Sequence, residues 1–87
     1  MYQVQFSESA LKDLKKLDKQ ITQMLFAWIT KNLVNTDNPR LHGKGLSADK
    51  AGMWRYRVGD YRILAHIEDS KLIILVVNAG HRRDIYK

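Results

Sequence analysis

The first residues of the chain alternate between apolar and polar side chains. Glutamines separate Tyr2, Val4 and Phe6, and this period of two predicts a half-buried strand over residues 2–6. Ser7 follows directly and offers a side-chain oxygen that can cap a helix. The apolar positions then recur in steps of three and four, which predicts a first amphipathic helix. Its apolar residues are Ala10, Leu11, Leu14 and Leu17.

A second helical stripe begins after Asp18, which we expect to cap the helix, and ends near Asn35. Its apolar residues are Ile21, Met24, Leu25, Trp28, Ile29 and Leu33. Residues 35–52 are rich in Asn, Asp, Gly and Ser and contain the single proline, so we predict a loop there. A loop of this length in a small domain suggests a functional role.

Strand patterns follow after Gly52. Residues 53–58 and 61–67 flank the pair Gly59-Asp60, which favours a tight hairpin turn. Residues 72–77 are apolar at every position, as expected for a strand in the middle of a sheet. The sequence therefore predicts an α+β fold with an N-terminal strand and a two-helix hairpin that packs on one face of a small antiparallel β-sheet.

The hairpin turn also predicts which side chains share a face. With Gly59 and Asp60 in the turn, Arg57 lies opposite Arg62, and like charges in that position destabilise a sheet by a few tenths to about 1 kcal/mol. One interpretation is that these side chains spread into water and keep the face soluble. The other is that they bind phosphate, whose oxygens fit the planar fork of arginine. The predicted basic side comprises Arg55, Arg57, Arg62 and His66, and the predicted apolar side comprises Trp54, Tyr56, Val58, Tyr61, Ile63 and Ala65.

Length and composition narrow the class of protein. A chain of 87 residues, 45% of them hydrophobic, suits a single domain over residues 1–87 with one core. The net charge of +6 indicates an anionic partner, either a nucleic acid or an acidic protein surface. The chain has no cysteine and its three histidines are scattered, so we expect neither a metal nor another cofactor. Without a signal-like leader or a long apolar run, we expect a soluble, cytoplasmic protein with no membrane partner.

The sequence WRYRVGDYRI at residues 54–63, the apolar strand after it and the closing GHRRDIY resemble the RelE branch of the RelE/ParE toxin superfamily, the toxins of bacterial type II toxin–antitoxin systems. The likeness spans essentially the whole chain, including the loop pattern PRxHGKxL. It implies a RelE-like fold and a ribosome-dependent endoribonuclease, an mRNA interferase, that cuts messenger RNA in the ribosomal A site by metal-independent attack of a 2′-hydroxyl. The implied partners are a cognate antitoxin, the 70S ribosome with its 16S ribosomal RNA and messenger RNA, and operator DNA bound through the antitoxin.

The resemblance also implies roles for individual residues. Arg57 and Arg62 are expected to hold the scissile phosphate, while Tyr86 acts as a base, positions the base or stacks on a nucleotide. His81 is a further candidate for proton transfer, because arginine hardly deprotonates. The expected catalytic residues are Arg55, Arg57, Arg62, His81, Arg82 and Tyr86. The expected RNA-binding residues are Lys12, Lys15, Lys16, Lys19, Arg40, His42, Lys44 and Arg83, with a merely solvated helix face as the alternative for the first four.

Two other functions are compatible with the same scaffold. ParE-like relatives inhibit DNA gyrase without cutting nucleic acid, and a plain RNA-binding module would hold RNA without cleaving it. Fold alone does not separate these functions. Alanine substitutions at Arg62 and Tyr86 separate them, because only the nuclease loses mRNA cleavage while keeping its fold.

Overall fold

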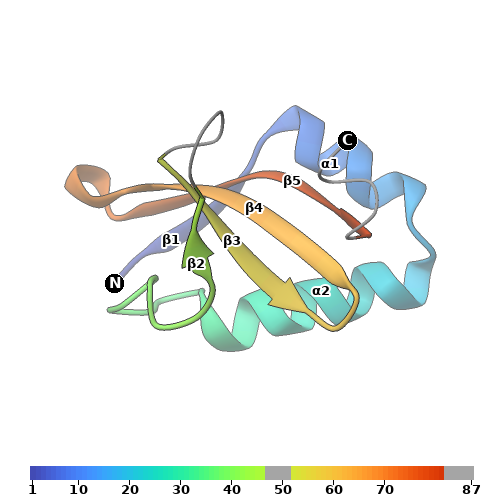
Figure 1. Cartoon of the computed structure of the whole chain (residues 1–87), viewed down its shortest axis with the longest axis horizontal. Coiled ribbons are helices and arrows are strands. Elements are labelled where there is room, and N and C mark those ends of the chain that lie inside the picture. Colours follow the sequence, from blue (N-terminus) through green and yellow to red (C-terminus); the bar gives the residue numbers. More distant parts are fainter. Residues whose placement is uncertain (47–51, 82–87) are drawn as a thin grey trace.

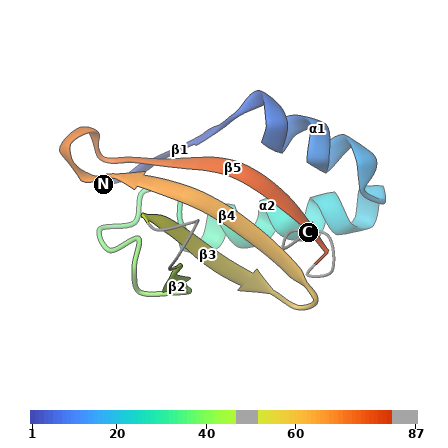
Figure 2. The same cartoon turned by 45° about the horizontal axis from the view of Figure 1, so that its top comes forward.

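The strands form one mixed sheet. A computed structural model of the chain describes residues 1–46 and 52–81. Its elements are β1 (Gln3–Phe6), α1 (Glu8–Lys16), α2 (Lys19–Asn32), β2 (Lys44–Gly45), β3 (Met53–Val58), β4 (Tyr61–Glu68), the 3₁₀ turn η2 (Asp69–Lys71) and β5 (Ile73–His81). The sheet order in these residues is β1-β5-β4-β3-β2 (Figure 1). In Figure 2 the sheet lies in front, with α2 behind it and α1 along its upper edge.

The predicted α+β class and two-helix hairpin are confirmed, and the sheet differs from the prediction in one pairing. The pairs β2–β3, β3–β4 and β4–β5 are antiparallel, whereas β1 runs parallel to β5. A two-residue turn permits only an antiparallel neighbour, which is why the hairpin was predictable. The connection that follows β1 contains two helices and is long enough to permit either direction.

β1 and α1 form where the pattern predicts them. Val4 and Phe6 pack against the core, and Ser7 caps α1 by accepting a hydrogen bond of 3.0 Å from the backbone N–H of Ala10. Ala10 and Leu14 are buried. Leu11, which we predicted to face the core, is 45% exposed. It lies about 100° around the helix from Ala10 and falls outside the stripe that meets the sheet.

α2 buries the centre of its predicted stripe. Leu25, Ile29 and Leu33 are buried, but Met24 at the margin of the stripe is 39% exposed. Asp18 occupies the N-cap position as predicted, yet its side chain makes no capping hydrogen bond. Its backbone carbonyl accepts the N–H of Thr22 at 3.0 Å instead, so backbone geometry begins the helix here.

The core lies between both helices and the apolar face of the sheet. The faces of the β3–β4 hairpin are those predicted, because Tyr56, Ile63 and Ala65 are completely buried in this core. Buried residues from every large element contribute to it: Tyr2, Ala10, Leu14, Leu25, Ile29, Leu33, Tyr56, Val58, Ile63, Ala65, Ile74, Val76 and Ala79. None of the helices in the described residues is both long and apolar enough to cross a bilayer.

β5 lies between β1 and β4, as its apolar sequence predicts. Leu72 does not begin the strand, however. It has a positive φ of 54°, is 45% exposed and closes the 3₁₀ turn. Further along, Leu64 pairs with Asn78 and Ala65 with Val76, so one extra residue of β5 forms a bulge.

Candidate nucleic-acid interface

The turn between β3 and β4 sets the register of the arginines. Gly59 has a φ of +60° and Asp60 does not have a positive φ, which is the pattern of a type II′ hairpin turn. Val58 pairs with Tyr61 at the end of the ladder, and Arg57 pairs with Arg62 one step further from the turn. The predicted register is therefore confirmed. Both arginines lie on the face of the sheet opposite the helices.

The two paired arginines have different surroundings. Arg57 is exposed, whereas Arg62 is 7% exposed and is the one charged side chain buried among the described residues. Nη1 of Arg62 makes only long hydrogen bonds, 3.3 Å to the carbonyl of Tyr61 and 3.4 Å to that of Gly59. No acceptor in the described part of the chain meets its buried Nε. A buried cation with an unused donor is costly in a structure and is typical of a site that binds an anion.

A second pair of cations lies beside the first. Lys44 of β2 pairs with Arg55 of β3, and directly opposed residues of a ladder point to the same face. Arg55 and Arg57 are two residues apart on β3, so they also share a face. We call the side chains of Lys44, Arg55, Arg57 and Arg62 the basic face.

Contacts of the preceding loop hold β2 at the edge of the sheet. The hydroxyl of Tyr56 donates a hydrogen bond of 2.6 Å to the carbonyl of Pro39, and burial raises the pKa of this phenol well above its ordinary value. The indole Nε1 of Trp54 donates one of 2.7 Å to the carbonyl of His42. Gly43 has a φ of +79°, and a β-carbon there would overlap the carbonyl oxygen of Arg55. Lys44 is therefore placed by a backbone contact that needs glycine.

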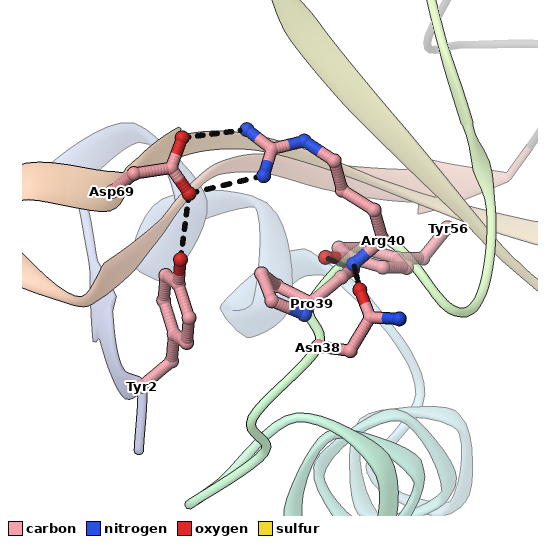
Figure 3. Close-up of polar contacts among 6 residues, drawn as sticks. All are labelled: Tyr2, Asn38, Pro39, Arg40, Tyr56 and Asp69. Carbon is pink, nitrogen blue, oxygen red and sulfur yellow. Dashed lines mark hydrogen bonds and ion pairs between the residues drawn. The ribbon is translucent and has the colours of Figure 1, made fainter.

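Arg40, predicted to bind RNA, forms part of a polar cluster at one end of the sheet (Figure 3). Its two terminal nitrogens donate hydrogen bonds of 3.0 and 2.9 Å to the carboxylate of Asp69, and the hydroxyl of Tyr2 donates one of 2.6 Å. These donors lower the pKa of Asp69 to about 2, and the hydrogen bond to Asp69 raises the pKa of Tyr2. The guanidinium also lies 5.9 Å from the ring centre of Trp54. RNA binding by Arg40 stays a prediction, while its structural contact is with Asp69.

The sequence contained no signal for this cluster. Asp69 is separated from Tyr2 by 67 residues and from Arg40 by 29, and neither spacing belongs to a helix or hairpin pattern. Only the topology of the sheet brings the three residues together.

The structure does not bring His81 to the basic face. His81 pairs with Tyr61, and the two rings meet edge to face at 5.4 Å, on the side of the sheet opposite Arg62. His42 is exposed, and its ring lies 5.7 Å from that of Trp28. His66 does share the side of the arginines, since it is paired with Met53.

The remaining predicted residues fall into two groups. Four exposed lysines lie on or just after α1, away from the basic face, so their RNA binding would require a separate contact surface: Lys12, Lys15, Lys16 and Lys19. Three residues of the tail lie outside the described residues: Arg82, Arg83 and Tyr86. Within residues 1–46 and 52–81, no three His, Cys, Asp or Glu side chains gather as a metal site would need.

Comparison with known proteins identifies the family. Residues 4–86 match the family described as the ParE toxin of the type II toxin–antitoxin system, parDE. The chain therefore belongs to the ParE toxin family, within the RelE/ParE superfamily. It is 33% identical over 86 residues to toxin RelG of Mycobacterium tuberculosis, covering 99% of this chain and 97% of that protein. More narrowly, it is a RelE-type toxin of a toxin–antitoxin system.

Solved structures agree with this placement. A chain in the crystal structure of the toxin–antitoxin complex RelBE2 from M. tuberculosis superposes with a TM-score of 0.85 and 31% identity, covering 95% of this chain and 93% of that one. The isolated Escherichia coli RelE toxin gives a TM-score of 0.74 at 23% identity, covering 99% and 92% of the two chains. The latter likeness concerns the fold alone.

Proposed function

We propose that this toxin is a ribosome-dependent endoribonuclease that cleaves messenger RNA in the ribosomal A site and is neutralised by a cognate antitoxin. The observation that carries the proposal is the cross-strand pair of Arg57 and Arg62, with its buried and incompletely hydrogen-bonded guanidinium. The name of the RelG relative supports a RelE-type toxin, and the endoribonuclease activity is what the family resemblance implies.

The proposed reaction replaces the bond from phosphorus to the 5′-oxygen with a bond from phosphorus to the 2′-oxygen. The ribose 2′-oxygen loses its proton and attacks the neighbouring phosphorus, and the bond from phosphorus to the 5′-oxygen breaks. The 5′-oxygen takes up a proton, which leaves a 2′,3′-cyclic phosphate and a free 5′-hydroxyl. Negative charge on the non-bridging oxygens increases in the transition state. Preorganised cations that face those oxygens stabilise the transition state more than the substrate.

Arg57 and Arg62 suit that role because of their ladder geometry. Directly opposed residues have β-carbons about 4.5 to 5.5 Å apart, so both guanidinium groups can bind the same phosphate. Arg62 is buried in the sheet and loses little freedom on binding, whereas Arg57 is exposed to the incoming strand. Arg55, one alternation further along β3, is placed to orient the RNA next to them.

Proton transfer requires a group that arginine cannot provide. His66 lies four residues from Arg62 along β4, about 13 Å away, which is too far to reach the same phosphate. His81 packs against Tyr61 on the other side of the sheet. We therefore propose Tyr86 as the base or base-positioning group, with Arg82 stabilising its charged form, as the family resemblance implies.

Cleavage on programmed ribosomes tests this proposal. Purified toxin is incubated with ribosomes carrying a defined message, and new 5′ ends are mapped, with free RNA as a second substrate. We expect a cut in the A-site codon for the wild type and for Lys31→Ala, a control at an exposed position on α2. We expect a loss of about 10² to 10³ in rate for Arg57→Ala and Arg62→Ala. An intact message with all four proteins would refute the nuclease.

A gyrase inhibitor is the second candidate, because the family that matches is named for ParE. It predicts an intact message together with loss of DNA supercoiling by gyrase. A plain RNA-binding module predicts RNA that is retained on the ribosome but uncut. One preparation of the toxin distinguishes the nuclease, the gyrase inhibitor and the RNA-binding module. It is added in parallel to programmed ribosomes and to a gyrase supercoiling reaction.

The antitoxin is proposed to cover the basic face. One of the similar structures is that of a toxin–antitoxin complex, RelBE2. An acidic segment of such a partner would complement the cations of the basic face and exclude RNA from it. Contacts with 16S ribosomal RNA, and operator DNA bound through the antitoxin, stay predictions.

A further inference from the structure

The basic face contains two cation pairs, whose members on β3 are two residues apart and therefore neighbours on one face. Arg57 lies opposite Arg62, and Arg55 lies opposite Lys44. Each pair places like charges directly across a ladder, which is unfavourable for the sheet. The proposed function uses Arg57 and Arg62 for the scissile phosphate and gives Arg55 only the orientation of the neighbouring RNA.

The separation of the pairs matches a polyanion with regularly spaced charges. Two residues along a strand span about 7 Å, and the pairs are offset by that distance along β3. Successive phosphates of an extended single strand of RNA lie at a comparable separation. A mononucleotide or a single inorganic phosphate would occupy only one pair.

Specific contacts of the preceding loop hold Lys44 opposite Arg55. The close approach of Gly43 to the Arg55 carbonyl and the bond from Trp54 to the His42 carbonyl fix the segment that carries Lys44. β2 is only two residues long, and Lys44 is one of them. A lysine on an edge strand can simply prevent aggregation, and that is the competing explanation. Edge protection would not require a fixed register opposite another cation.

We propose that Lys44 and Arg55 form a subsite for the phosphate adjacent to the scissile one, so that the toxin holds two successive phosphates of single-stranded RNA. This inference rests on the proposed function, because Arg57 and Arg62 define which phosphate is cut. It assigns Lys44 to binding and not to chemistry. The RNA segment must be single-stranded and extended, because the phosphates have to follow the direction of β3.

Neutral linkages in the message test the subsite. Chemically synthesised messages carry one methylphosphonate, which has no charge, either on the 5′ side or on the 3′ side of the scissile linkage. With the normal message, Lys44→Ala should reduce kcat/KM by about ten- to hundredfold, while Lys31→Ala should have no effect. With one of the two methylphosphonate messages, the kcat/KM of the wild type should fall by the same factor. On that message, Lys44→Ala should cause no further loss. Equal losses from Lys44→Ala on all three messages would overturn the proposal.

A binding measurement separates this inference from the nuclease activity. A trinucleotide contains two phosphates and a dinucleotide contains one. With a 2′-deoxy sugar at the cleavage position, neither is cut. Each single-strand phosphate contact contributes about 0.7 to the slope of log affinity against log salt. By NMR titration, Lys44→Ala should lower the slope by that amount for the trinucleotide and leave the dinucleotide unchanged. If the wild type does not cleave messages, the proposed function fails, whereas an unchanged trinucleotide slope overturns the subsite.

Discussion

Arg57 and Arg62 face each other across the β3–β4 ladder, yet one is exposed and the other is 7% exposed. The pair therefore combines an exposed cation with a buried one. Proximity of like charges lowers stability, and the same proximity concentrates positive potential where a phosphate would bind. Stability and binding should respond to this pair in opposite directions.

Arg57→Gln should separate the two effects. Glutamine keeps the unbranched stem and a polar end but removes the charge, so the free energy of unfolding should rise by a few tenths to about 1 kcal/mol. Cleavage on programmed ribosomes should fall by about 10² to 10³. Urea denaturation and single-turnover cleavage measure the two quantities. A variant that is both less stable and fully active would contradict the role given to Arg57.

Tyr56→Phe should destabilise the loop that precedes β2. The substitution removes the 2.6 Å hydrogen bond to Pro39 and leaves that carbonyl without its partner in a buried position. We expect a loss of about 1 to 3 kcal/mol in the free energy of unfolding, measured by urea denaturation. Tyr2→Phe is the matched control, since its hydroxyl bonds to the exposed carboxylate of Asp69 and should matter less. Equal losses would argue against a special role for the buried bond.

Gly43→Ala should be more harmful than Gly59→Ala. Both residues have a positive φ, which costs an alanine about 1 kcal/mol or more. A β-carbon at Gly59 meets no atom within 4 Å, whereas one at Gly43 would overlap the backbone of Arg55. Gly43→Ala should therefore also displace Lys44 and weaken RNA binding. Thermal unfolding and the trinucleotide titration test this order, and the reverse order would refute the packing argument.

Asp69→Asn should remove part of the acid sensitivity of the fold. Hydrogen bonds from Arg40 and Tyr2 lower the pKa of Asp69 from 3.8 to about 2. Because the folded chain binds this proton less readily than the unfolded chain, the stabilisation is complete above about pH 4 and is lost as pH falls towards 2. Unfolding by urea at several pH values between 5 and 2 should show a steeper decline for the wild type than for Asp69→Asn. Parallel curves would mean that this carboxylate does not contribute.

The basic face could be predicted where local rules determine the geometry. A Gly-Asp turn of two residues fixes the pairing of its strands, and alternation then assigns every arginine to a face. The burial of Arg62 could not be predicted in the same way, because it depends on how the sheet and its neighbours close around β4. His81 was predicted as a catalytic candidate from its position beside Arg82. The bulge in β5 and its pairing with Tyr61 place it on the other side of the sheet.

Long-range contacts account for the other differences. No periodicity in residues 35–52 indicates that Lys44 forms a strand, because β2 exists only through its bonds to β3. The contact between Arg40 and Asp69 likewise depends on the tertiary structure, which brings two distant segments together. Burial was predictable for residues at the centre of each apolar helix stripe. At the margins of the stripes, at Leu11 and Met24, the prediction of burial was wrong, because the neighbouring element decides burial there.

The parallel pairing of β1 with β5 joins residues 3–6 to residues 73–76. During synthesis, β1 emerges about 70 residues before its partner strand, so the sheet cannot close until residues 73–76 have been made. The basic face acquires its complete support at the same late moment, because β4 is held between β3 and β5. The face that carries the four cations therefore depends on contacts between residues that lie far apart in the sequence.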